Sequence, residues 1–259
     1  MPGAVYRAMV CEYNGTAGYE AYFTDTSSDN PANQTMDGIM INEVDADTPG
    51  TDTLEFIELY DGGTGSVGLT GLVLVFYDGT TDLSYTAIDL DGHATDANGY
   101  FVIGNAGVSG VDVTFPNNTL QDGADAVALY VGNGSDFPNG TAVTTANLID
   151  ALVYDTDDAD DAGLLTLLIS GGQVNENGRG DSAGDSNQRI PNGTGSLRST
   201  TAYDQQPPTP GAQNYAYPEI ISATYDYTTN HLVVTGAYLV AAAGTDNDVD
   251  VSLLTVTGE

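Results

Sequence analysis

Short apolar runs separated by polar turns dominate the pattern of this chain. The runs of β-strand length are residues 39–44, 54–60, 72–77, 84–90, 100–103, 126–131 and 148–154. Glycine, aspartate and asparagine are frequent between them, as at Asp61-Gly62-Gly63 and Asp122-Gly123. Strand-length runs joined by such turns predict an all-β fold, either a sandwich or a barrel. The run over residues 72–77 is apolar throughout, which predicts a strand buried on both faces.

Helical periodicity is weak throughout the sequence. Residues 163–169 form the one plausible short helix, and the same residues fit a strand equally well. In the second predicted strand, Phe56, Glu58 and Tyr60 share one face, because side chains alternate along a strand with a period of two. We expect this face, and Glu58 with it, to point to solvent. A buried hydrogen-bonding role for Glu58 near Arg189 is the alternative.

The pattern divides the chain into three parts. Residues 1–37 are a leader or the end of a preceding domain, with strand candidates at 4–10 and 19–23. Residues 38–214 hold the main series of strands. Proline-rich residues 205–211 predict a domain boundary or a sheet edge, because proline cannot donate to a sheet ladder. Residues 215–259, with strands expected at 219–225 and 231–235, predict the opening hairpin of a second β-sandwich-like domain.

The charge balance is strongly acidic. The chain carries 37 Asp and Glu residues against 4 Lys and Arg residues, a formal net charge of −33, and it contains no lysine. Aspartate favours turns over helices, which places much of this charge in loops. Self-repulsion destabilises a compact fold unless salt or bound divalent cations screen it. We therefore expect a saline or calcium-rich extracellular setting, with general solubility as the simpler alternative. Binding of nucleic-acid phosphates through this surface is disfavoured, since such contacts use Lys and Arg.

Cysteine content and hydropathy set further limits. Cys11 is the sole cysteine, so no internal disulfide can form. No apolar run approaches the roughly 20 residues of a membrane-spanning helix. Residues 1–10 lack the apolar segment of a secretion signal. These features predict a fragment of a longer secreted or cell-surface chain that has no membrane span.

Four segments between residues 38 and 214 carry a family resemblance. They are residues 41–44 with 55–61, residues 69–72, residues 120–130, and residues 186–193 with 208–214. These segments resemble the lamin tail domain family in its bacterial, extracellular form. The resemblance implies an immunoglobulin-like β-sandwich that serves as a module and not as an enzyme. Leu72 departs from the pattern, because the family usually has tryptophan there and this chain has none.

The C-terminal part carries a weaker resemblance. Residues 222–226, 232–236 and 253–259 are similar to tandem β repeats of large bacterial surface proteins. Bacterial modules of the lamin tail type accompany extracellular nucleases or phosphatases, or stand in adhesin-like chains. The resemblance therefore implies other domains of the same long chain as the first partners.

Calcium is the one cofactor that the sequence suggests, because calcium takes six to eight oxygen ligands. The first candidate loop holds Asp155, Asp157, Asp158, Asp160 and Asp161, the second holds Asp45, Asp47 and Asp52, and the third holds Asp246, Asn247, Asp248 and Asp250. None of them matches the calcium loop of an EF-hand. The alternative for each is a solvated acidic loop of a salt-adapted protein. Elsewhere, Arg189 is expected to make a structural, charge-assisted bond to a carboxylate.

Catalytic motifs are weak, so we expect no enzyme activity. Cys11 would need His93 or His231 as its base, and both histidines stand in polar turns. A serine triad would also need a correctly oriented histidine.

Three functions remain open at this point. The first is a non-catalytic structural or interaction module of a secreted or cell-surface multidomain protein, stabilised by calcium or salt. The second is an accessory domain of an extracellular nuclease or phosphatase. The third is a module that binds surface polysaccharide or matrix through some of its 16 tyrosines.

Overall fold

The computed structural model describes residues 38–216, 219–226, 228–229 and 231–237, together with two short strands near the N-terminus. These strands are β1 (Tyr13–Asn14) and β2 (Ala21–Tyr22), which pair antiparallel. The strand candidate at residues 4–10, Cys11 and the third calcium candidate at residues 246–250 lie outside the described residues. The chain divides into two compact units, Met1–Asn214 and Tyr215–Glu259.

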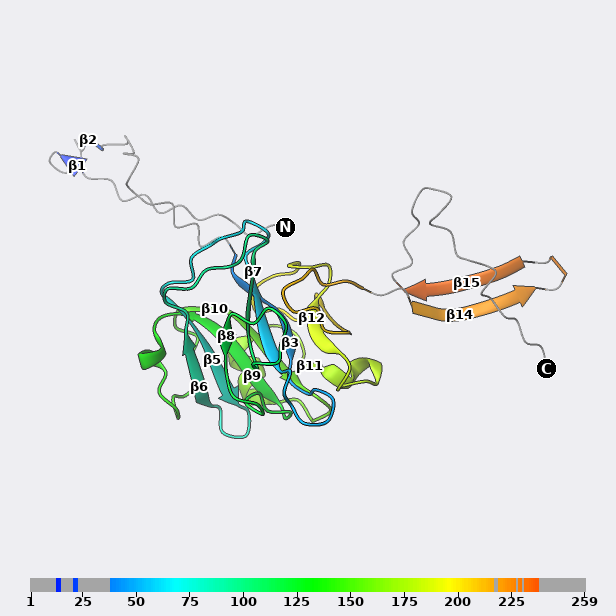
Figure 1. Cartoon of the computed structure of the whole chain (residues 1–259), viewed down its shortest axis with the longest axis horizontal. Helices are drawn as coiled ribbons and strands as arrows, with labels where there is room; N and C mark the ends of the chain where they lie inside the picture. Colours follow the sequence, from blue (N-terminus) through cyan, green and yellow to red (C-terminus); the bar gives the residue numbers. More distant parts are fainter. Residues whose placement is uncertain are drawn as a thin grey trace. The chain divides into compact units, whose positions relative to one another are not determined.

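Two facing sheets make up the body of the first unit (Figure 1). The five-stranded sheet contains, in spatial order, β11 (Val174–Asn175), β10 (Leu148–Asp155), β9 (Asp125–Val131), β5 (Leu72–Asp78) and β6 (Leu83–Asp89). The six-stranded sheet contains β13 (Tyr203–Gln206), β12 (Ser186–Arg189), β3 (Met40–Asp45), β4 (Phe56–Tyr60), β7 (Tyr100–Gly104) and β8 (Val113–Thr114). This arrangement confirms the all-β prediction and selects the sandwich over the barrel.

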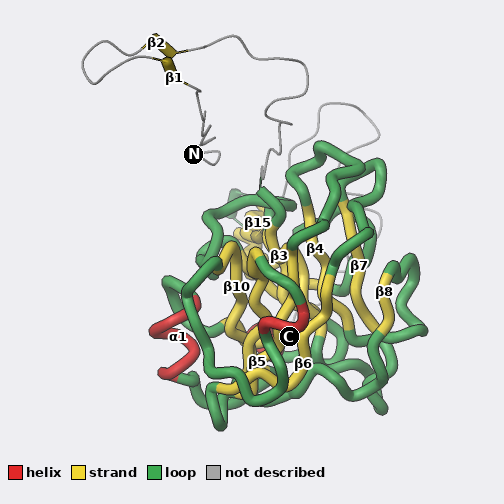
Figure 2. The backbone as a smooth tube through the Cα atoms, turned by 90° about the vertical axis from the view of Figure 1, so that its left-hand side faces the viewer, coloured by secondary structure: helices red, strands yellow, loops and turns green. Residues whose placement is uncertain are grey.

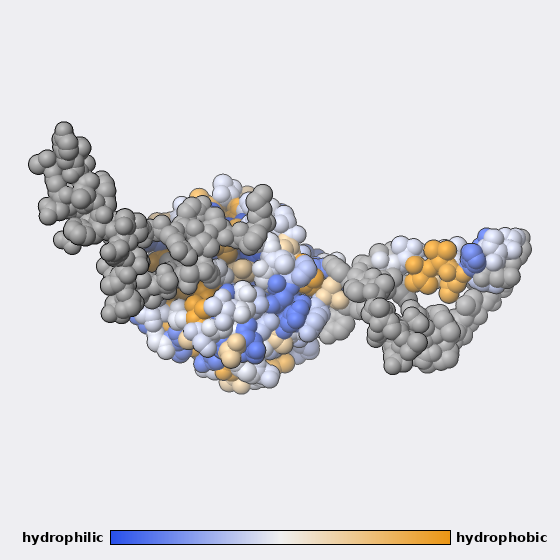
Figure 3. Space-filling view, turned by 90° about the horizontal axis from the view of Figure 1, so that it is seen from above, coloured by the Kyte–Doolittle hydropathy of each residue, from blue (hydrophilic) through white to orange (hydrophobic). Residues whose placement is uncertain are grey.

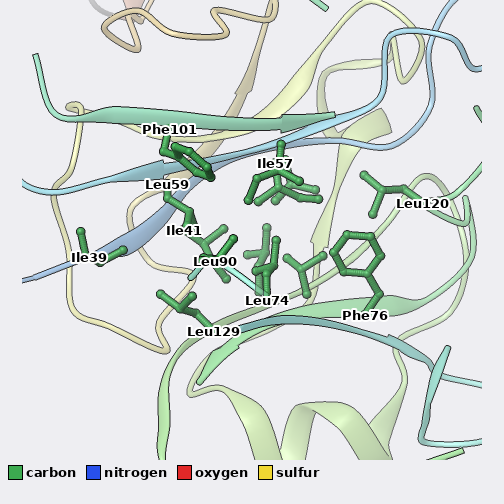
Figure 4. Close-up of a cluster of buried hydrophobic side chains, with 14 of the residues drawn as sticks. Ile39, Ile41, Ile57, Leu59, Leu74, Phe76, Leu90, Phe101, Leu120 and Leu129 are labelled. Carbon is green, nitrogen blue, oxygen red and sulfur yellow. The ribbon is translucent and has the colours of Figure 1, made fainter. Parts of the chain in front are cut away.

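The main core fills the space between the two sheets. Ile57 and Leu59 of β4 and Phe101 of β7 face Leu74 of β5 and Leu129 of β9 (Figure 4). All of these side chains are at most 1% exposed. Burial of one such side chain contributes roughly 1.5–3 kcal/mol, so this layer is the principal source of stability.

Strand β5 is buried on both faces, as its apolar sequence predicts. It lies between β9 and β6 in the five-stranded sheet. Leu72, Leu74 and Phe76 belong to the core between the sheets. Val73, Val75 and Tyr77 belong to a second apolar cluster on the opposite face.

A short helix covers that opposite face. Residues 163–169 fitted a helix or a strand, and the structure has a helix, α1 (Ala162–Leu168), drawn in red in Figure 2. Its Leu164 and Leu168 are fully buried in the second apolar cluster. Phe137 joins the same cluster just after the 3-10 turn η1 (Gly134–Asp136). A second 3-10 turn, η2 (Glu176–Arg179), follows β11.

Polar strands β12 and β13 complete the six-stranded sheet, and the apolar pattern did not predict them. Their sequences are Ser-Asn-Gln-Arg and Tyr-Asp-Gln-Gln, which contain almost no apolar side chains. Strand β13 is one edge of the sheet, and the prolines of residues 205–211 follow its last residue. Residues 207–214, called the exit segment below, follow β13 and precede the second unit.

The second unit contains an antiparallel hairpin of β14 (Glu219–Asp226) and β15 (His231–Ala237). These strands confirm the two that were expected at 219–225 and 231–235. Leu232, Val233 and Val234 are 38–59% exposed, and Figure 3 shows the hairpin with an orange apolar patch. A two-stranded hairpin is marginally stable by itself, so β14 and β15 need further packing partners.

Membrane-spanning helices are absent among the described residues, since none of their helices is both long and apolar enough to cross a bilayer.

The first prediction concerns the core between the sheets. Leu74→Ala should reduce the free energy of unfolding by about 2–5 kcal/mol, because it leaves a cavity among fully buried side chains. Leu197→Ala is the matched control, since Leu197 is 40% exposed, and it should change stability by no more than about 0.5 kcal/mol. Urea unfolding measures both values. Equal losses for the two variants would contradict the assignment of this core.

Candidate functional site

The first predicted calcium loop does not gather its five carboxylates around one point. Asp155 is buried at the end of β10, where its Oδ2 accepts a hydrogen bond of 2.6 Å from Gln173 Nε2 and its Oδ1 has no partner. Asp161 caps α1 by accepting a 2.7 Å bond from the Leu164 amide. The remaining members of the loop are exposed: Asp157, Asp158 and Asp160.

The second predicted loop likewise gives each aspartate a separate environment. Asp45 ends β3, is 4% exposed and leaves its Oδ1 without a partner. Asp47 accepts a 2.8 Å bond from the Ser182 hydroxyl. Asp52 accepts a 2.9 Å bond from the Thr48 amide. Within the described part of the chain, no group of three or more His, Cys, Asp or Glu side chains is arranged to hold a metal ion.

The two predicted loops nevertheless lie near each other. Burial raises the pKa of Asp122, and the charges of Asp52, Asp47 and Asp158 raise it further. Asp122 is therefore close enough to carboxylates of both loops for their charges to act on it. We call Asp122, Asp47, Asp52 and Asp158, together with Asp45 and Glu176, the acidic end of the sandwich.

Glu176 is the member of the acidic end that the sequence did not reveal. It is fully buried, and its two carboxylate oxygens accept bonds of 2.8 and 3.1 Å from the Ala46 and Asp47 amides. Burial raises the pKa of Glu176 well above its ordinary value, and the charges of Asp47 and Asp122 add to the rise. No local signal marks Glu176, because its partners are about 130 residues away in the sequence.

An ion pair between the two sheets confirms the role expected for Arg189. Arg189 Nη2 of β12 lies 3.0 Å from Asp150 Oδ2 of β10, and both side chains are fully buried. Arg189 Nε also donates to the Ile41 carbonyl at 2.8 Å. Its guanidinium stacks over the Tyr203 ring, 4.8 Å from the centroid. Asp150 accepts a further 2.9 Å bond from the Ile41 amide, so the pair ties β12, β10 and β3 together.

Glu58 is buried, which overturns the solvent-facing orientation that strand alternation favoured. It does lie with Phe56 and Tyr60 on the outer face of the six-stranded sheet, away from the main core. The exit segment covers this face, and the Gly211 amide donates to Glu58 Oε2 at 2.7 Å. Glu58 is not bonded directly to Arg189; the two are linked through asparagines, since Asn214 Nδ2 donates to the Arg189 carbonyl and Asn42 Nδ2 to Glu58.

The histidines do not form a catalytic pair with any residue that the structure places. The His93 ring packs against Phe101, with centroids 5.4 Å apart, and is a packing residue. His231 is the first residue of β15 in the second unit. Cys11 lies outside the described residues.

The second prediction tests the Arg189–Asp150 pair. Asp150→Leu alone should destabilise the fold by about 3–5 kcal/mol, because it leaves a buried guanidinium without its counter-charge. The double variant Asp150→Leu with Arg189→Met should lose less than the sum of the two single losses. Denaturant unfolding of the four proteins gives the coupling energy. Strict additivity would show that the two side chains do not interact.

The third prediction concerns pH. Burial is the main cause that raises the pKa of Glu55 and of Asp125 to about 7 each. A raised pKa means that the folded state favours the protonated form. The stability that protonated Glu55 and Asp125 contribute is fully present below the ordinary carboxyl pKa. It is lost as pH rises through about 7.

The free energy of unfolding should therefore decline between pH 5 and pH 8 at constant ionic strength, by an amount on the order of 2–3 kcal/mol for Glu55. Glu55→Gln should flatten this decline, because the amide does not ionise. A stability that increases steadily from pH 5 to pH 8 would contradict the assignment.

Comparison with protein families agrees with these features. The Lamin Tail Domain model matches residues 32–174, more than half of the chain, from before β3 to the start of β11. No curated protein and no solved structure matches. Lamin tail domains are immunoglobulin-like, non-catalytic structural or interaction domains, which confirms the fold that the resemblance implied. The two-layer sandwich and the extent of the match together show that the chain belongs to the lamin tail domain family.

Proposed function

We propose that this chain is a module of a secreted or cell-surface multidomain protein of the bacterial, extracellular type, and that dissolved cations stabilise it. The acidic end is the observation that carries this proposal. Several loops far apart in the sequence bring carboxylates together there; burial raises the pKa values of Asp45, Asp122 and Glu176, and the charges of neighbouring carboxylates raise them further. Such repulsion is costly in dilute buffer and is reduced by cations.

Cations can stabilise this end in two ways. Salt at high concentration screens the net charge of −33 without any specific site. Calcium can instead bind to the loop of Asp155, Asp157, Asp158, Asp160 and Asp161, or to the loop of Asp45, Asp47 and Asp52. Buried oxygens that lack a donor support the second way: Asp45 Oδ1 and Asp155 Oδ1, one in each loop.

The second β unit supports the multidomain part of the proposal. Its hairpin exposes apolar side chains and follows the sandwich directly, as one module follows another in a long chain. The first partners of the sandwich are then other domains of the same chain. Surface polysaccharide or matrix is the proposed external partner.

The fourth prediction separates calcium from salt. Thermal unfolding is recorded in EDTA and in millimolar calcium at fixed ionic strength, and again in EDTA from 0.05 to about 1 M NaCl, where the Debye length falls to about 3 Å. Calcium present at about 100 times its Kd should add about 2.7 kcal/mol of stability. Salt alone should raise the midpoint whether or not calcium binds.

Matched variants locate the effect. Asp158→Asn removes one negative charge from the acidic end. Asp91→Asn removes one negative charge from the exposed turn after β6, at the other end of the sheet. In EDTA and low salt, Asp158→Asn should raise the midpoint more than Asp91→Asn. A midpoint unaffected by calcium removes the calcium part. A midpoint unaffected by both calcium and salt overturns stabilisation by cations.

A further inference from the structure

The exit segment is fastened to a pair of buried carboxylates on the outer face of the six-stranded sheet. Glu43 of β3 and Glu58 of β4 are direct partners in the strand register, and both are 0% exposed. The Thr209 amide and hydroxyl donate to the two Glu43 oxygens at 2.8 and 3.0 Å. The Gly211 amide donates to Glu58 at 2.7 Å. The segment that leads to the second unit thus rests on two neighbouring acidic groups.

Elements around the carboxylate pair supply hydrogen-bond donors but no cation. Ser186 of β12 donates to Glu43 at 2.6 Å, and Asn42 donates to Glu58 at 2.7 Å. The exit segment itself, residues 207–214, and the neighbouring turn, residues 190–196, contain no titratable side chain.

Among the described residues, the titratable groups that act on the pair are acidic or neutral. Burial is the main cause that raises the pKa values of Glu58, Asp45 and Tyr100. The charge of Asp96 adds to the rise for Glu58, that of Glu43 to the rise for Asp45, and that of Glu58 to the rise for Tyr100. The positive charge of Arg189 is directed to Asp150, in the other sheet. Two full negative charges on Glu43 and Glu58 would therefore lack compensation.

We propose that Glu43 and Glu58 form a pH-sensitive latch, which holds the exit segment while the pair keeps a proton and lets residues 208–212 lift away when both carboxyls ionise. Lifting the segment admits water to the carboxylates and removes the cost of keeping two charges buried side by side. The chain just before the second unit is then held less tightly at higher pH.

The direction follows from the acid–base properties of the pair. Burial raises the pKa of Glu43 to about 7 and that of Glu58 well above its ordinary value, and the charge of Glu43 raises the pKa of Glu58 further. The closed latch therefore binds protons more tightly than the open latch. Protons favour closure, and closure weakens as pH rises through about 7.

Asn214 fixes the far end of the segment with uncharged partners. Its backbone amide donates to Asn192 Oδ1 at 3.1 Å, so this bond does not depend on the ionisation of Glu43 or Glu58. Its side chain donates to the carbonyls of Asn42 and Arg189, each at 3.2 Å. Release should therefore be confined to the stretch around Thr209 and Gly211.

The fifth prediction uses residue-resolved amide hydrogen exchange of the full chain between pH 5 and pH 8, corrected for the intrinsic effect of pH on exchange. Protection of the Thr209 and Gly211 amides should fall by about tenfold or more over this range, since one unit of pKa displacement corresponds to a tenfold change in the equilibrium. The amides of Asn214 and of the core strand β5 should keep their protection.

Two matched variants test the cause. Glu43→Gln keeps an oxygen that accepts from the Ser186 hydroxyl and the Thr209 amide. Its new NH2 group can donate to Thr209 Oγ1. The Thr209 hydroxyl can then donate to Asn214 Oδ1, which lies 3.0 Å away. This variant should retain protection of Thr209 and Gly211 at pH 8. Glu55→Gln is the control, because Glu55 is also fully buried but bonds to Asn105 and Thr119. It should leave the pH dependence at Thr209 unchanged.

Three results would overturn the latch. The first is constant protection of Thr209 and Gly211 in the unaltered protein, a measurement that needs no variant. The second is a parallel loss at Asn214 and in β5, which would indicate unfolding of the whole sandwich. The third is a pH dependence in Glu43→Gln as steep as in the unaltered protein. None of these results depends on calcium, so the latch and the proposed cation stabilisation stand or fall separately.

Discussion

The scarcity of cationic side chains is the constraint on which the rest of this structure depends. Four Lys and Arg residues face 37 Asp and Glu residues, so most buried acids must be stabilised without an ion pair. Backbone amides and hydroxyl or amide side chains take that place at Glu43, Glu58 and Glu176. Burial raises the pKa of these three carboxyls more than their neutral donors lower it, which makes stability and local opening sensitive to pH.

Arg189 places one cationic side chain in the buried space between the two sheets. It joins the two sheets through Asp150, stacks on Tyr203 of β13 and donates to the backbone of β3. Strands β12 and β13 lack the apolar residues that hold the other strands in place. Their position therefore rests on this ion pair and on the polar contacts around it, beyond the range that the family match covers.

The two faces of the sandwich differ in how they are closed. A helix covers the five-stranded sheet through Leu164 and Leu168, whose side chains carry no ionisable group. The exit segment covers part of the six-stranded sheet through bonds to the carboxylates of Glu43 and Glu58, which form the proposed pH-sensitive latch. The module thus combines a stable apolar body with an adjustable connection to the chain that follows.

Sequence alone determined the apolar framework. The alternating and continuous apolar runs predicted the strands β3 to β7, β9 and β10, because a strand buries such side chains together against the core. The burial of β5 on both faces and the charge-assisted bond of Arg189 could also be anticipated, the first from its composition and the second from the rarity of arginine. Of the segments that carried the resemblance, residues 41–44 with 55–61, 69–72 and 120–130 lie inside the family match, and residues 186–193 with 208–214 lie outside it.

The tertiary structure decided which polar residues are buried and which partners they bond to. Glu58 alternates onto the outer face as its strand position requires, yet it is buried because the exit segment, some 150 residues later, covers that face. Asp150 and Glu176 likewise gain their roles from partners that are distant in the sequence. A carboxylate in a loop or strand has the same local sequence whether it meets water or a donor from elsewhere. Long-range contact is therefore the physical reason why its role could not be deduced from the chain alone.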